Sequence, residues 1–229
     1  MNYFAHGRHF IDDPYLLAGT AVPDWLNVSD RGVRVRTRHA EAWLLDADPR
    51  LRSLARGVAQ HHADDGWFHA TTAFAELSWR LTADIRDLLG RDDGLRPSFL
   101  GHILVEILLD ATLIDQQPER LTDYYEAFSG LDAVLVAELV NRMAPRPTQR
   151  LAQFIPLFTA ERFLWDYADD GKLCYRLNQV MRRVGLNELP GEFAALLPTA
   201  RRLVYDRQHE LLTPEADLAA NARTAETRR

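Results

Sequence analysis

SFLGHILVEILLDATLI, residues 98–114, is the stretch of the sequence that decides the fold class. Its apolar side chains predict a buried helix, yet His102, Glu106 and Asp110 interrupt it at four-residue steps. Side chains four residues apart on a helix drift by only about 40° per step, so all three share one face. The stretch therefore predicts a core helix that carries a stripe of ionisable groups.

Helical periodicity continues outward from this stretch in both directions. The predicted helices are Tyr15–Leu26, Pro49–His62, Trp67–Leu89, Pro97–Asp115, Pro118–Phe128, Leu131–Met143, Thr148–Tyr167, Lys172–Val184 and Phe193–Leu212. The best strand candidate, GVRVRT at residues 32–37, is short and has no obvious pairing partner. We therefore expect an all-α, multi-helix bundle.

Length and composition indicate a single domain. The chain has 229 residues, of which 47% are hydrophobic, enough for one sizeable core. The end of the chain has no large apolar residue after Leu218. We expect one helical domain over residues 1–213 and a disordered tail over residues 214–229. An aromatic series is interpreted as core or as the contact face of a homodimer: Phe154, Phe158, Phe163 and Trp165.

Charge and cysteine content bound the compartment and the partners. The single Cys174 cannot form an internal disulfide and no signal peptide is recognisable, so we expect a cytoplasmic protein. Residues 98–114 fall short of the roughly 20 apolar residues that cross a bilayer, so we expect no membrane span. With 33 acidic and 27 basic residues, the net charge of −6 disfavours nucleic acid as a partner. An anionic substrate would have to be held locally.

Histidines concentrate in the first half of the chain, where we expect any catalysis. Seven of the eight lie within the first 102 residues. The segment QHHADDGWFH, residues 60–69, gathers His61, His62, Asp64, Asp65 and His69. Imidazole and carboxylate groups bind divalent ions such as zinc, manganese, iron or magnesium, so the segment predicts a metal site. Asp64-Asp65-Gly66 is interpreted as a turn between two helices.

Helix geometry limits how the stripe can bind an ion. Residues four apart can chelate one ion, but His102 and Asp110 are separated by about 12 Å of helix rise. The stripe therefore predicts either two nearby ions or one ion held by an adjacent pair, with the third group supporting a ligand. The expected pair is Glu106 with Asp110, or His102 with Glu106. A lone buried acid is more often a hydrogen-bonded core residue than a ligand. Three such groups on one apolar face favour a cation, because each buried unpaired carboxylate would cost several kcal/mol.

Three patches of the first 115 residues resemble the acyl carrier protein phosphodiesterase family. The opening MNYFAHGRHFIDDPYLLAGTAVPDWL is similar to the family's Met-Asn-aromatic/apolar-Ala-His start and its Leu-x-Gly-x-x-x-x-Asp segment. The matching residues are Asn2, His6, Leu17, Gly19 and Asp24. The second patch, His61, Asp65 and His69, resembles the family's His-x-x-x-Asp segment with a further His. The third, Glu106-ILL-Asp110, resembles its later Asp-x-x-x-Asp, with Glu in place of the first Asp.

The resemblance implies an HD-domain-like fold and a metal-dependent phosphodiesterase, or more broadly a phosphohydrolase, with manganese as the typical ion. It also implies acyl carrier protein as a substrate. Because such carriers are acidic, a basic patch would be needed to dock them. One basic run could form this patch or could equally be a solvated loop: Arg31, Arg34, Arg36 and Arg38. One pocket, with one or two divalent ions bound by no more than about six ligands, is expected to gather the polar groups that apolar segments least explain: His6, Asp24, His61, His62, Asp65, His69, His102, Glu106 and Asp110. Asp65 or Asp110 is expected to act catalytically, by orienting the attacking water or taking its proton.

Three alternatives remain open on the sequence. His39 in GVRVRTRH competes with His61 and His62 as the central ligand. A zinc-dependent, phospholipase C-like hydrolase would also gather His and Asp ligands in an all-α bundle. The third alternative is a non-enzymatic helical scaffold that keeps a structural metal.

Overall fold

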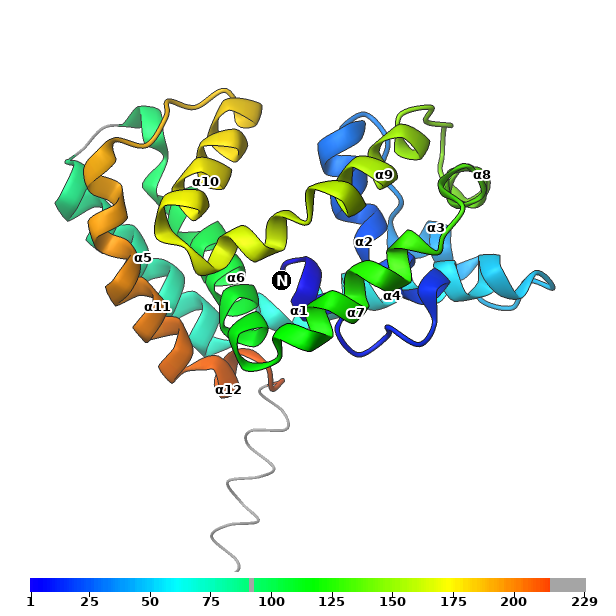
Figure 1. Ribbon diagram of the computed structural model, residues 1–229, viewed down its shortest axis with the longest axis horizontal. Helices are drawn as coiled ribbons and strands as arrows, with labels where there is room; N and C mark the ends of the chain where they lie inside the picture. The colour runs from blue at the N-terminus through cyan, green and yellow to red at the C-terminus, as the bar shows by residue number, and fades with distance from the viewer. Residues whose placement is uncertain (91–92, 215–229) are drawn as a thin grey trace, which may run out of the picture. The chain divides into compact units, whose positions relative to one another are not determined.

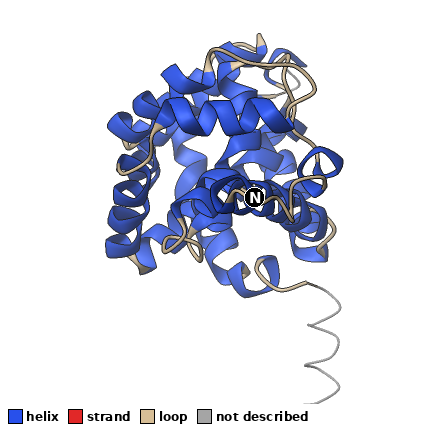
Figure 2. Cartoon of the chain, turned by 90° about the vertical axis from the view of Figure 1, so that its right-hand side faces the viewer, coloured by secondary structure: helices blue, strands red, loops and turns tan. Residues whose placement is uncertain are grey.

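The computed structural model describes residues 1–90 and 93–214, and within these ranges every regular element is a helix. The fold is therefore all-α, and Figure 2 shows helices joined by loops. The α-helices are α1 (Tyr3–Gly7), α2 (Pro14–Ser29), α3 (Thr37–Glu41), α4 (Pro49–Phe68), α5 (Thr72–Leu89), α6 (Pro97–Gln116), α7 (Pro118–Ser129), α8 (Ala133–Met143), α9 (Leu151–Glu161), α10 (Asp170–Val184), α11 (Leu197–Asp206) and α12 (Gln208–Leu211). Shorter 3-10 helices are η1 (Asp93–Leu95), η2 (Phe163–Ala168) and η3 (Gly191–Leu196).

The helices predicted from periodicity are confirmed, and two predicted segments are divided. The segment Thr148–Tyr167 becomes α9 and η2, which are separated by Arg162 with a left-handed φ of 46°. The segment Phe193–Leu212 becomes η3, α11 and α12. Helices α1 and α3 were not predicted, because five residues are too few to show a period. Residues 33–36 form no strand, and of the predicted tail only Pro214 lies within the described residues.

The predicted turn at residues 64–66 is wrong, because α4 continues through it. Both aspartates have partners one helical turn earlier. Asp64 accepts a hydrogen bond of 2.8 Å from Nε2 of Gln60, and Asp65 lies 3.4 Å from Nε2 of His61. Pairs at this spacing support a helix, which explains how it accommodates Gly66.

The chain divides into two compact units. Unit 1 comprises Met1–Asn2, Gly66–Gln116 and Leu164–Arg229, and unit 2 comprises Tyr3–Asp65 and Gln117–Phe163. The single helical domain over residues 1–213 stays a prediction.

The core of unit 1 is formed by α5, α6 and α11, which pack against one another (Figure 1). Gly101 permits the close approach of α6 to α5, because a Cβ there would lie 2.7 Å from the carbonyl oxygen of Ser78. Helix α6 is also long and apolar enough to cross a membrane by length and composition alone. However, 67% of its most apolar window is buried inside the protein, as it is in ordinary core helices.

In unit 2, two glycines bring α2 and α4 into backbone contact. A Cβ on Gly57 of α4 would lie 2.7 Å from Cα of Gly19 in α2, and would overlap the carbonyl oxygen of Leu16. Helix α1 packs on α2 and α7, and all five of its residues are buried. This arrangement holds the N-terminal His6 and the α4 residues that follow Gly57 in one place.

Candidate metal centres

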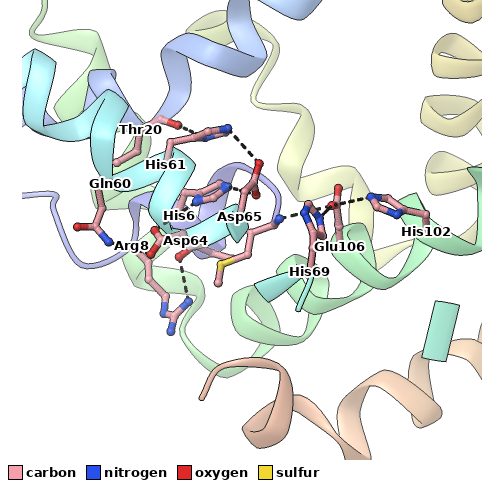
Figure 3. A network of polar contacts seen from close by, with 12 residues as sticks. His6, Arg8, Thr20, Gln60, His61, Asp64, Asp65, His69, His102 and Glu106 are labelled. Carbon is pink, nitrogen blue, oxygen red and sulfur yellow. Dashed lines mark hydrogen bonds and ion pairs between the residues drawn. The ribbon is translucent and has the colours of Figure 1, made fainter. Parts of the chain in front are cut away.

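Unit 2 gathers His6 of α1 with His61 and Asp65 of α4 (Figure 3). Nε2 of His6 lies 3.2 Å from Oδ1 of Asp65, and Nε2 of His61 lies 3.4 Å from Oδ2 of the same residue. The two imidazole rings stack with centroids 4.2 Å apart. Two imidazole nitrogens and a carboxylate within 4.8 Å of one another form a donor set suited to a divalent ion. We call these three residues the unit 2 trio.

The contact between α2 and α4 orients His61. One turn after Gly57, Nδ1 of His61 donates a hydrogen bond of 2.8 Å to the carbonyl oxygen of Thr20, the residue after Gly19. A proton on Nδ1 leaves Nε2 of the neutral ring as the nitrogen with a lone pair. Backbone carbonyls commonly fix metal-binding histidines in this way. The fold thus presents Nε2 of His61, the nitrogen that could bind an ion, toward Asp65.

A parallel arrangement orients His6. Its Nδ1 lies 3.3 Å from Oδ2 of Asp64, whose other oxygen accepts the amide of Gln60. Its Nε2 is fully buried, and its contact with Oδ1 of Asp65 at 3.2 Å is an ion pair rather than a well-formed hydrogen bond. Buried polar atoms normally form good hydrogen bonds, so a buried nitrogen and a carboxylate oxygen in this arrangement could share an ion instead. The residues of the unit 2 trio therefore fit a metal.

The carboxylates of Asp64 and Asp65 stabilise a positive charge on His6. Burial favours the neutral imidazole, but the carboxylates of Asp64 and Asp65 outweigh it and raise the pKa of His6 to about 9. Burial also favours the neutral form of Asp65, yet His6 and His61 hold the pKa of this carboxyl far below its usual range. Metal binding requires a deprotonated imidazole. An ion that replaced the His6 proton would therefore keep a positive charge beside the two carboxylates.

A pocket of about 390 Å³ opens beside the unit 2 trio. Two members of the trio, His61 and Asp65, form part of its wall. The rest of the lining is Pro23, Asp24, Asn27, Arg34, Val35, Arg36 and His62. Two arginines beside a candidate metal centre suit an anionic ligand, because guanidinium groups match phosphate and carboxylate geometry.

Unit 1 gathers a second group, His69, His102 and Glu106, which we call the unit 1 trio (Figure 3). Oε1 of Glu106 lies 2.7 Å from Nε2 of His69 and 3.3 Å from Nε2 of His102. The amino nitrogen of Met1 lies 3.4 Å from the same oxygen. Burial favours the neutral carboxylic acid, but His102, His69 and this amino group outweigh it and lower the pKa of Glu106 to about 2.

Several predicted ligands fall outside both trios. Asp110 is fully buried in α6 but belongs to neither group, so of the two proposed stripe pairs the structure brings together His102 and Glu106. Asp24 and His62 line the pocket instead, and Nε2 of His62 donates to the carbonyl oxygen of Val35 at 2.8 Å. The convergence of all the predicted ligands on one centre stays a prediction, as does the catalytic role of Asp110.

Other features of the site bear on what the sequence left open. His39 accepts the backbone N–H of Arg36 on its Nδ1 at 3.1 Å and is in neither trio, so His61 is the better-placed central ligand.

Asp64, Gln60 and the Thr20 carbonyl were not singled out as supports for the ligands. The four-residue spacing of Gln60 and Asp64 is visible in the sequence, whereas the carbonyl contact depends on the packing of α2.

Comparisons of the chain with models of protein families, with curated proteins and with solved structures found no match.

Proposed function

We propose that the chain is a metal-dependent phosphoester hydrolase whose ion is held by the unit 2 trio. The observation that carries the proposal is the fully buried Nε2 of His6, which lies 3.2 Å from Oδ1 of Asp65 in an ion-pair contact that is not a well-formed hydrogen bond. Manganese is the ion suggested by the resemblance to acyl carrier protein phosphodiesterases. Zinc, iron and magnesium also suit two imidazoles and a carboxylate to differing degrees.

The substrate class follows from the arginines of the adjacent pocket. Arg34 and Arg36 line the same pocket as His61 and Asp65, so an anion bound by the guanidinium groups would reach the metal centre. Nη1 of Arg34 donates to Oδ1 of Asn27 at 3.1 Å, which restrains this long side chain. A phosphoester carries negative charge and has non-bridging oxygens, two of which can accept hydrogen bonds from one planar guanidinium group.

The chain's own groups have distinct tasks in this proposal. A bound ion would lower the pKa of a water molecule and polarise the phosphoryl oxygens. Asp64 and the Thr20 carbonyl hold the two imidazoles, and Asp65 supplies the carboxylate ligand. Asp24, on the pocket wall but outside the trio, would accept a proton from the attacking water in this proposal. Carrier protein as the natural substrate, and an HD-domain-like arrangement of the helices, are further parts of this proposal.

The decisive experiment removes and restores the metal. Protein freed of metal by chelation is reloaded separately with Mn²⁺, Zn²⁺ or Mg²⁺, and is then assayed on bis-p-nitrophenyl phosphate and p-nitrophenyl phosphate. We expect turnover only with metal, and a loss of at least about 100-fold in Asp65→Asn, since this change removes a ligand. Asp87→Asn, which neutralises an exposed aspartate of α5, is the matched control. Activity in the metal-free protein, or full activity in Asp65→Asn, would refute the proposal.

A further inference from the structure

The unit 1 trio has no task in the proposed hydrolysis. We propose that His69, His102 and Glu106 form a second divalent-cation site, which takes zinc or a similar ion and joins the turn after α4 to α6. The inference does not depend on the proposed hydrolase activity. It concerns other residues in the other unit, and it is tested by counting bound ions rather than by measuring hydrolysis. It rests on the geometry, the support and the solvent access of the three donors.

One pair of donor atoms has the spacing of zinc ligands, and the pair formed by His69 and Glu106 is closer because it is a hydrogen bond. Ligands at about 2.0–2.1 Å from a tetrahedral ion lie about 3.3 Å from one another. Oε1 of Glu106 lies 2.7 Å and 3.3 Å from Nε2 of His69 and His102, respectively. All three donor atoms lie within 4.8 Å of one another, so small side-chain rotations would place them around one ion.

Two separate elements supply these donors in fixed positions. His102 and Glu106 are one turn apart on α6, a spacing at which helical side chains chelate a single ion. His69 lies in the turn between α4 and α5, where the backbone N–H of Thr71 donates to the carbonyl oxygen of Phe68 at 3.1 Å. An ion held by both elements would therefore connect positions 37 residues apart in sequence.

Phe74 supports both imidazoles from α5. Its ring centroid lies 4.8 Å from that of His69 and 4.8 Å from that of His102, and the histidine rings lie 4.9 Å apart. Because Phe74 is itself 5% exposed, the support is part of the core of unit 1. The histidines are thus held near each other before any ion binds, which reduces the entropy lost on binding.

Solvent access separates this site from the unit 2 trio. The side chains of His69 and His102 are 34% and 43% exposed, whereas those of His6 and His61 are 0% and 4% exposed. Water can therefore complete the coordination of an ion in unit 1. The amino group of Met1 lies 3.4 Å from Oε1 of Glu106 and competes with an ion for this carboxylate. The experiment must therefore count bound ions directly.

The test titrates chelator-treated protein with Zn²⁺ alone by calorimetry, and repeats it with Co²⁺ while recording the visible absorption of the bound ion. We expect two ions per wild-type chain, one in Glu106→Gln, one in Asp65→Asn and none in the double variant. Thermal unfolding of Asp65→Asn should still respond to Zn²⁺, because binding to the folded state stabilises it by mass action. That response should disappear in the double variant.

Two further variants keep the test decisive. His102→Gln changes a half-exposed residue on the surface of α6, so it reports on the site if Glu106→Gln does not fold. His209→Gln, in α12 of the same unit, controls for the loss of a histidine outside the trio. Wild-type stoichiometry in both Glu106→Gln and His102→Gln, or a single ion in the wild type that Asp65→Asn removes, would overturn the inference. Because ions are counted, loss or absence of hydrolysis does not alter the result.

Discussion

Nδ1 of His61 lies 2.8 Å from the carbonyl oxygen of Thr20, and this hydrogen bond depends on the glycine contact one turn earlier in α4. Gly19 and Gly57 let the backbones of α2 and α4 touch, so a ligand on one helix is oriented by a peptide group on the other. Residues outside the unit 2 trio therefore determine the direction of the His61 nitrogen that faces Asp65.

Gly57→Ala should disturb both stability and metal binding. The added methyl would overlap the carbonyl oxygen of Leu16, so the helices must separate, and we expect a loss of about 1–3 kcal/mol in the free energy of unfolding. Gly66→Ala in the same helix is the matched control, because nothing lies within 4 Å of its added Cβ. It should stabilise the protein by about 0.5–1 kcal/mol through helix propensity. Urea unfolding measures both changes, and equal effects would contradict the close-contact argument.

Asp64→Asn should weaken metal binding without removing a ligand. The carboxylate of Asp64 faces Nδ1 of His6 at 3.3 Å and is held by Gln60 at 2.8 Å. An amide keeps the shape but loses the charge that orients and polarises the imidazole, so we expect affinity for Mn²⁺ to fall by about 10- to 100-fold. Competition with a metal-sensitive dye measures the change. Unaltered affinity would show that Asp64 does not support the ligand.

Arg36→Gln should weaken substrate binding more than it affects the chemical step. Arg36 lines the pocket beside the unit 2 trio, whereas Arg31 is an exposed arginine of the same segment that does not. If Arg36 holds a phosphoester in both the bound and the transition state, KM should rise by about tenfold, equivalent to about 1.4 kcal/mol, with kcat little changed. Arg31→Gln removes the same charge and should leave KM near the wild-type value. A similar KM in both variants would argue against Arg36 as a phosphate contact.

Metal removal should lower the stability of the wild-type protein reversibly. An ion present at about 100 times its dissociation constant stabilises the folded state by about 2.7 kcal/mol per site. Chelation should therefore lower the midpoint of thermal unfolding, and Mn²⁺ or Zn²⁺ should restore it. His39→Gln, outside both trios, should retain the full response. An unfolding midpoint that does not depend on metal would contradict both candidate centres.

The sequence was sufficient for the helices because their starts and apolar faces are local properties. Proline opens α4, α6 and α7 at the residues predicted, since its fixed φ and missing N–H suit the first turn. The interpretation of Asp64-Asp65-Gly66 as a turn failed because local and distant contacts both favour the helix. His6, nearly sixty residues earlier, and the α4 partners Gln60 and His61 engage both aspartates and keep the segment helical.

The site was predictable as a set of residue types, but its grouping was not. The spacing of His61 with Asp65, and of His102 with Glu106, already identified pairs able to share an ion. Which histidine joins each pair depends on tertiary packing, because His6 comes from α1 and His69 from the turn after α4. Asp110 shows the limit of the helical stripe, since a shared face does not bring residues eight positions apart to one point.

The different burial of the two trios predicts two rates of metal exchange. Ligand exchange requires a chelator to reach the coordination shell, and the imidazoles of His6 and His61 are almost wholly enclosed. Those of His69 and His102 are open to solvent. A loaded chain should therefore release one ion to a chelator quickly and the other only as fast as local opening of unit 2 permits. If release has two phases, the rate constant of the slow phase would measure how fast the helices around His6 open.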